Sequence, residues 1–200
     1  RSENGVGLWL SGMDIAAADA LRLNPGHRID PVPVLCYLDR GPGAAIRRVR
    51  TRLSADVINP VAVIRVPRER VAGHGIASSL FHEIGHQGAA LLDLVESLRC
   101  ALRRREADST GTTRLAWHCW AAWVSEITAD FWSVAKLGIG STLGLLGVVS
   151  LPRPFVFRFT LDDPHPFPWI RVMVSAGIGE HLYPDPQWAR IRRLWTRLYP

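Results

Sequence analysis

The chain has 200 residues, 48% of them hydrophobic and 21% charged, which is typical of an ordinary soluble globular protein with one sizeable core. The formal net charge of +6 at pH 7 makes a nucleic-acid partner conceivable. We expect no such partner, because the aromatic residues cluster in apolar segments instead of interleaving with the arginines. The arginines, concentrated at positions 47–52, 65–70, 103–105 and 190–197, are interpreted as solvated faces.

Cysteine usage and the longest apolar run bear on location. Cys36, Cys100 and Cys119 are an odd, widely spaced set, typical of neither a disulfide framework nor a sulfur-ligated zinc site. We interpret them as buried free thiols, which favours a reducing, cytoplasmic compartment. The uncharged run at 137–152 is shorter than the ~20 residues of a spanning helix and rich in glycine. It predicts a buried helix and a loop, with peripheral membrane contact as the alternative.

The first half of the chain mixes helix and strand patterns. A helix is expected at 13–23, followed by the turn sequence NPGHRIDP and a strand at 32–38. Ile46, Val49 and Leu53 stand at helical spacing and predict an amphipathic helix after the Gly-Pro-Gly turn. Residues 61–66 then alternate like a half-buried strand, and the following Pro67 favours an edge position.

Two long helices are expected next. Residues 73–105 form one helical pattern with Ser78 and Ser79 as candidate caps, and the polar residues 106–113 end it. Residues 114–138 form the second, whose four tryptophans are assigned to the core. No internal repeat or low-complexity linker divides the chain, so we expect a single domain over residues 1–200. Because the first residue is Arg1 rather than Met, we expect a segment of a longer or processed protein.

The motif HEIGH lies within the first of these helices. The spacing of four residues puts His82 and His86 one turn apart on one face, where both imidazoles can bind one zinc ion. Glu83 projects beside the metal, where its carboxylate can take a proton from a zinc-bound water and deliver it to the leaving amine. The alternative is a helix with two histidines on its polar face. Gly85 counts against that alternative, because a glycine inside a helix suggests close approach of a backbone or a ligand.

The second long helix carries a pair of acids, Glu126 and Asp130, one turn apart. They are the only acids between Trp117 and Val134, and unpaired carboxylates in so apolar a helix would be costly to bury. A catalytic zinc needs a third protein ligand, and we assign Glu126 to that role. Asp130 is assigned to the imidazole N–H of a ligand histidine.

The combination of HExxH and a later Glu-x-x-x-Asp resembles the gluzincin metallopeptidases. The form EITAD, followed by DDPHPFPWIR, resembles most closely the CAAX-prenyl endopeptidases and their bacterial heat-shock relatives, without their transmembrane helices. The resemblance covers roughly residues 60–171. By this analogy His165 and Arg171 are candidate stabilisers of the tetrahedral oxyanion. The alternatives are that His165 caps a proline-rich turn and that Arg171 pairs with Asp162 or Asp163.

Other candidates near the site are weaker. His118 lies on roughly the same helical face as Glu126, although a core histidine bonded to the backbone is favoured. His74, His181 and Tyr183 are weaker still.

We therefore expect an α+β, zincin-like fold: a small mixed sheet whose edge strand at 61–66 lines a cleft, the HExxH helix, and the second, Glu-bearing helix. The expected activity is Zn²⁺-dependent endopeptidase hydrolysis of a peptide or protein substrate that binds as an added strand. Two rival hypotheses remain. One is a non-catalytic zinc-binding sensor or structural domain. The other is a basic nucleic-acid-associated protein in which HExxH is accidental.

Overall fold

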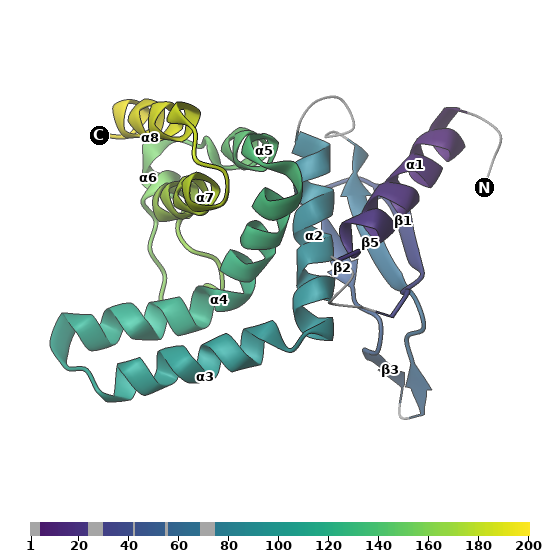
Figure 1. The fold of residues 1–200 in the computed structure, drawn as a ribbon, viewed down its shortest axis with the longest axis horizontal. Coiled ribbons are helices and arrows are strands. Elements are labelled where there is room, and N and C mark those ends of the chain that lie inside the picture. The colour runs from purple at the N-terminus through teal and green to yellow at the C-terminus, as the bar shows by residue number, and fades with distance from the viewer. Residues whose placement is uncertain (1–4, 24–29, 42, 55, 69–74) are drawn as a thin grey trace.

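The computed structural model describes residues 5–23, 30–41, 43–54, 56–68 and 75–200, with Gly75 and Ile76 described by their backbone alone. The candidate His74 lies outside these residues. Figure 1 shows a small sheet and α1 at one end of the molecule and a group of helices at the other, with α2 between them. The fold is a mixed α+β arrangement, as the sequence predicted.

A three-stranded mixed sheet forms one side of the core. Its strands are β1 (Val34–Asp39), β5 (Ala62–Pro67) and β2 (Ala45–Arg47), in the order β1-β5-β2. β1 is parallel to β5 and β2 is antiparallel to it. Because side chains alternate along a strand, one face carries Cys36, Ile64 and Val66 into the core, where they pack with α1 (Gly5–Ala20) and α2 (Gly75–Leu91).

The prediction that residues 61–66 form an edge strand is wrong. β5 is the central strand, and Pro67 is its last residue, so the missing N–H costs the interior of the ladder nothing. The open edge that neighbours the helices belongs to β2 instead (Figure 1).

The amphipathic helix predicted around Ile46 and Leu53 is also wrong. Ile46 pairs with Ile64 in the sheet, and the chain then forms a small hairpin of β3 (Arg52–Ser54) and β4 (Val57–Ile58). Between β2 and β3, Arg50 takes a left-handed backbone conformation with φ 65°, which is incompatible with a continuous helix. Pairing with β5 has overridden the helical spacing.

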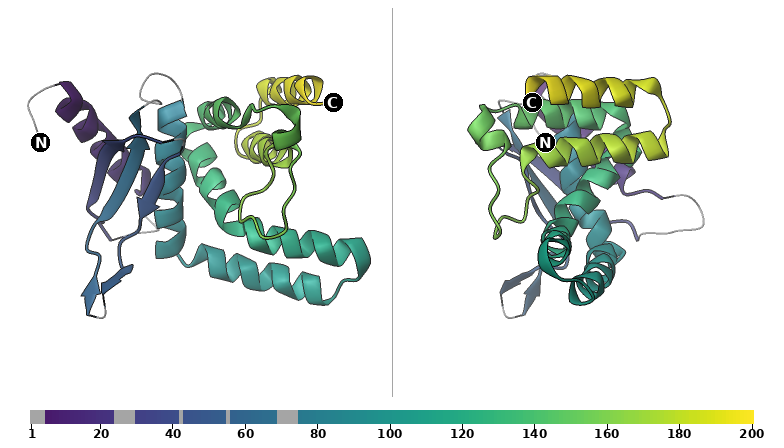
Figure 2. Two further views of the ribbon diagram at one scale, coloured as in Figure 1. Left: turned by 180° about the vertical axis from the view of Figure 1, so that it is seen from behind. Right: turned by 90° about the vertical axis from the view of Figure 1, so that its left-hand side faces the viewer.

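The long helix predicted at 73–105 is divided into α2 and α3 (Leu94–Ala107). Asp93 lies at the break with φ 52° and ψ 30°. This left-handed residue redirects the chain, so that α3 runs along the first part of α4 (Gly111–Leu137) while α2 packs against its second part (Figure 1). The two further views in Figure 2 show α3 and α4 side by side in an arm.

Four more helices complete the helical group: α5 (Ile139–Val149), α6 (Arg153–Val156), α7 (Pro168–Leu182) and α8 (Pro186–Leu198). The glycine-rich run forms a helix, α5, as predicted, but only one side of it is buried, and Leu143 on the other side is 46% exposed. α5 follows a sharp turn at Gly138 with φ 57°. Val172 and Trp195 of α7 and α8 pack with Leu145 of α5 in a second apolar cluster. Within the described part of the chain, no helix has the length and apolar character needed to cross a membrane.

Two hydrogen bonds connect α4 to the last residue of α1 and to the segment that follows it. The indole N–H of Trp132 donates to the carbonyl of Ala20 at 3.1 Å, and Lys136 Nζ donates to the carbonyl of Arg22 at 2.6 Å. Trp132 is buried in the same cluster as Ile64 and Ile84, so a side chain of α4 contributes to the core beneath the sheet.

The expectations for individual thiols and tryptophans hold in part. Cys36 and Cys119 are buried free thiols, as predicted. Cys100 is exposed instead, because it lies on α3, a helix without any buried residue. Among the tryptophans of α4, Trp123 and Trp132 are buried, whereas the two nearer its start are half-buried.

Candidate metal centre

Close packing of α2 against α4 creates the site. A Cβ atom added at Gly85 would lie 2.8 Å from the carbonyl oxygen of Ala129, and one added at Gly88 would lie 2.5 Å from the ring of Trp132. Only glycine permits this approach, which agrees with the close backbone contact that Gly85 suggested. Next to this contact, the histidines of α2 face the carboxylates of α4.

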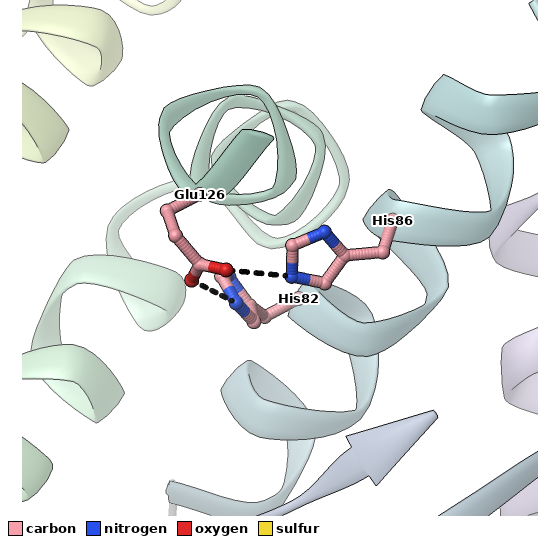
Figure 3. Close-up of side chains that lie close together, drawn as sticks. All are labelled: His82, His86 and Glu126. Carbon is pink, nitrogen blue, oxygen red and sulfur yellow. Dashed lines mark ion pairs between the residues drawn. The ribbon is translucent and has the colours of Figure 1, made fainter. Parts of the chain in front are cut away.

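His82, His86 and Glu126 converge on one point (Figure 3). Glu126 Oε2 lies 3.2 Å from His82 Nε2, and Glu126 Oε1 lies 3.3 Å from His86 Nε2. Taking one donor atom from each residue, all three lie within 4.8 Å of one another. Around a tetrahedral zinc with bonds of about 2.0–2.1 Å, donor atoms are separated by about 3.3–3.4 Å. Two imidazoles and one carboxylate are also a donor set that zinc accepts, so the residues fit the ion.

Asp130 and Arg171 orient His82. Asp130 Oδ1 lies 2.8 Å from His82 Nδ1, which turns the other ring nitrogen, Nε2, toward Glu126. Arg171 of α7 donates to both carboxylate oxygens of Asp130, from Nε at 2.7 Å and from Nη2 at 2.9 Å. The alternative that Arg171 pairs with Asp162 or Asp163 is therefore wrong: its partner is the acid on α4, with which it forms a bidentate pair.

Ser125 was not identified by the sequence analysis. Its Oγ lies 3.4 Å from His86 Nδ1, where it contacts the second histidine as Asp130 contacts the first. Ser125 directly precedes Glu126, the third proposed ligand. Its place next to that ligand in the sequence is the signal that could have identified it. A serine is so common on helices that its type alone gave no indication.

Opposite charges in the cluster shift the pKa values of His82, Glu126 and Asp130 so that each group favours its charged form. Burial alone would lower the pKa of His82, but the charge of Asp130 and hydrogen bonds to Asp130 and Glu126 raise it to about 9. Burial would raise the pKa of Glu126 and of Asp130. For Glu126 this effect of burial is outweighed by hydrogen bonds to His82 and His86 and by their charges, and its pKa lies well below the usual range. For Asp130 it is outweighed by the charges of Arg171 and His82, and its pKa is likewise well below the usual range.

Glu83 lines a pocket of about 230 Å³ that also contains His82 and Glu126. Burial raises the pKa of Glu83 above its usual value, although the charges of the two histidines act in the opposite direction. A carboxylate with a raised pKa is a stronger base, which suits proton transfer near neutral pH. The remaining walls come from the segment before β2, from α2, α4, α5 and α7, and from the loop before α7. Their residues are Gly43, Ala44, Ser78, Ser79, Asp130, Ser141, Leu145, Val148, His165 and Arg171.

His165 reaches this pocket from the loop before α7. Its Nε2 lies 3.5 Å from Glu126 Oε2, while its Nδ1 and its backbone N–H both lie 2.9 Å from Asp163 Oδ1. The turn-capping contact and the position beside the cluster, given as alternatives by the sequence, therefore coexist. Trp123 of α4 packs edge-on against Phe159 and Phe167 of the same loop, which fixes the loop over the pocket.

The weaker candidates lie elsewhere. His118 is exposed and contacts Glu106 at 3.1 Å, so it is neither near the cluster nor a core histidine. Tyr183 is 48% exposed and its hydroxyl donates to the carbonyl of Ala135, and His181 is exposed at the end of α7. None of the three lines the pocket.

Comparisons with protein-family models, with curated proteins and with solved structures give no significant match. The functional argument therefore depends on the geometry and chemistry of these side chains.

Proposed function

We propose that this chain is a zinc-dependent peptide hydrolase with a zincin-like arrangement. The observation that carries the proposal is the convergence of His82, His86 and Glu126 within 4.8 Å, with Glu83 in the same pocket. A structural zinc site needs no additional carboxylate beside its ligands, whereas hydrolysis needs a general base there. The neighbouring edge of β2 gives the proposed substrate a strand to pair with, since the segment before β2 lines the pocket at Gly43 and Ala44.

The residues of the pocket have distinct roles in this proposal. Zinc held by the three ligands would supply a Lewis acid for the attacking water and the scissile carbonyl. Glu83 accepts a proton from that water as its oxygen attacks the carbonyl carbon, and then donates the proton to the amine nitrogen as the C–N bond breaks. The negative charge of Glu126 lowers the net charge of the centre.

Arg171 and His165 are the proposed stabilisers of the oxyanion. Arg171 Nη2 lies 3.5 Å from Glu126 Oε2, and the same carboxylate oxygen lies 3.5 Å from His165 Nε2. Both groups therefore lie beside a ligand atom of the proposed zinc site, near which we expect negative charge to develop on the carbonyl oxygen. Arg171 is held by Asp130, so it needs little reorganisation, and His165 is 53% exposed at its side chain, which leaves it accessible to a substrate.

The test combines zinc content with hydrolysis of a mixed peptide library. Wild-type protein should contain one zinc per chain and cleave peptides. Glu83→Gln should retain the zinc and lose about 10²–10⁴-fold in kcat, because general-base catalysis contributes that range. Glu96→Gln is the matched control, since this exposed glutamate of α3 should leave both zinc content and rate unchanged.

Each outcome distinguishes the candidates. Zinc without activity in the wild type would favour the non-catalytic zinc-binding domain. Purified protein that fails to bind zinc on reconstitution would contradict both zinc hypotheses. Equal activity of Glu83→Gln and wild type would be compatible with the metal site but would contradict the role of Glu83 as the general base.

A further inference from the structure

A separate apolar groove lies on α4, roughly a third of a turn around the helix from Glu126 and Asp130. One wall is a stripe at helical spacing along α3, and the other is formed by α4 and one residue of α7. Its residues are Leu94, Leu98, Ala101, Leu102 and Arg105, then Trp120, Val124, Ile127, Thr128 and Phe131, and finally Ile178. This α3/α4 groove has a volume of about 500 Å³, within the range of about 300–1,000 Å³ found for small-molecule sites.

The packing of α3 on α4 leaves the groove unfilled. No residue of α3 is buried, and the apolar side chains of Leu98 and Phe131 remain 45% and 42% exposed. Covering such surface is favourable by roughly 25 cal/mol per Å², so an apolar ligand chain would gain affinity here.

Two residues of the lining, Thr128 and Arg105, carry polar groups. The hydroxyl of Thr128 donates to the carbonyl of Val124 at 2.6 Å, so it has its own partner inside α4. Arg105 is the charged residue of an otherwise almost wholly apolar lining. Its guanidinium lies just beyond the groove, 5.3 Å from the centre of the ring of Trp117, which is not a lining residue. The ring positions the guanidinium by covering one face, while the N–H donors in its plane can still bind an anion.

We propose that the α3/α4 groove binds a single long-chain carboxylate, a fatty acid, with its carboxylate at Arg105 and its chain running toward Leu94. The charge pattern supports this ligand class, because one cation ends an otherwise apolar channel. The length also fits. From Leu94 to Arg105 α3 rises about 16 Å at 1.5 Å per residue, and an extended alkyl chain advances about 1.3 Å per C–C bond, so about twelve carbons span the groove.

Calorimetric titration with two amphiphiles of equal chain length tests the proposal on the unmodified chain. Laurate and dodecyltrimethylammonium are compared below their micelle concentrations. Laurate should bind one per chain and about two- to fivefold more tightly, the range expected from the modest strength of an exposed ion pair. Equal affinities for the two amphiphiles, or no saturable laurate binding, would overturn the proposal.

Variants locate the ligand. Arg105→Gln should remove the preference for laurate, whereas Arg103→Gln, an exposed arginine outside the lining, should keep it. Ala101→Phe places a ring in the groove and should weaken laurate binding at least tenfold, with circular dichroism verifying the fold. Unchanged laurate affinity in a folded Ala101→Phe protein would contradict a fatty-acid site in the groove.

Discussion

The same helix, α4, packs in two contrasting ways. Against α2 the contact is tight: Gly85 and Gly88 have no side chains, and Ala129 and Trp132 occupy the space that a Cβ would need. Against α3 the contact is loose: leucines face apolar residues of α4, no α3 residue is buried, and a groove remains. The ionisable cluster lies on the tight side. Charged groups are costly to bury unless their partners are held at hydrogen-bond distance, and the glycine contact provides that rigidity.

The largest expected effect comes from breaking the ion pair on the tight side. Arg171→Met leaves the buried carboxylate of Asp130 without its guanidinium and should lower the free energy of unfolding by about 3–5 kcal/mol. Urea denaturation of the metal-free protein measures the loss. Arg192→Met is the matched control: this arginine pairs with the partly exposed Glu180, so its change should be much smaller. Similar losses in the two variants would contradict the special cost of the buried pair.

Separating α2 from α4 is the next test. Gly85→Ala forces the added methyl against the Ala129 backbone and should destabilise the protein by about 1–3 kcal/mol, as overpacking does. It should also weaken zinc binding, because Glu126 moves away from the histidines. Gly147→Ala in α5 is the control; its Cβ meets open space, and it should be neutral or stabilising by up to about 1 kcal/mol. Full zinc affinity in Gly85→Ala would contradict the idea that the metal site depends on the close packing of α2 against α4.

The pKa of His82 links metal binding to pH. In the metal-free protein this pKa is raised to about 9, and a zinc ligand must be unprotonated, so binding at pH 7.5 should release about one proton from His82. Zinc affinity should therefore fall as pH falls below about 9, by up to about tenfold per unit, or about 1.4 kcal/mol. Calorimetry in buffers of different ionisation enthalpy counts the protons. Asp130→Asn removes the charge that raises this pKa and should reduce the release.

The same shift affects the stability of the metal-free protein. Because the folded-state pKa exceeds the usual value of 6.5, the stabilising contribution of protonated His82 is fully present below pH 6.5. It is lost as the pH rises through about 9. A free energy of unfolding that stays level over this interval would contradict the raised pKa.

The loose side should respond least. Leu98→Ala on α3 removes a side chain that is already 45% exposed, and we expect a loss below about 1 kcal/mol. Leu80→Ala on α2, where the leucine is 2% exposed, should cost about 2–5 kcal/mol. Thermal or urea unfolding of the pair quantifies the contrast between the two sides. A loss for Leu98→Ala comparable with that of Leu80→Ala would mean that α3 is packed more firmly than its exposure indicates.

The elements of the site were accessible from sequence because they depend on local spacing. Four-residue intervals on two long helices put His82 with His86, and Glu126 with Asp130, on single faces. The glycine at position 85 indicated a close approach. What the sequence could not give was the partner of Arg171, which reaches Asp130 across 41 positions although nearer acids were equally plausible.

The errors in the fold have the same physical origin. The residues around Ile46 satisfy a helical period, yet a strand partner on β5 outweighs that local preference. Pro67 suggested an edge because a proline removes a donor, but the terminal position of a central strand tolerates it equally well. The break at Asp93 had no glycine or proline to mark it, and aspartate adopts the left-handed conformation only occasionally, so its presence does not predict a break.

The bonds from Trp132 and Lys136 to the end of α1 constrain how the chain is made. Their partners are 112 and 114 positions earlier, so α1 and the sheet leave the ribosome well before their covering side chains are synthesised. Until α4 emerges, the apolar surface around Ile64 and Ile84 lacks the indole that completes its core. We therefore expect the nascent chain to expose apolar surface that favours aggregation until α4 has been made.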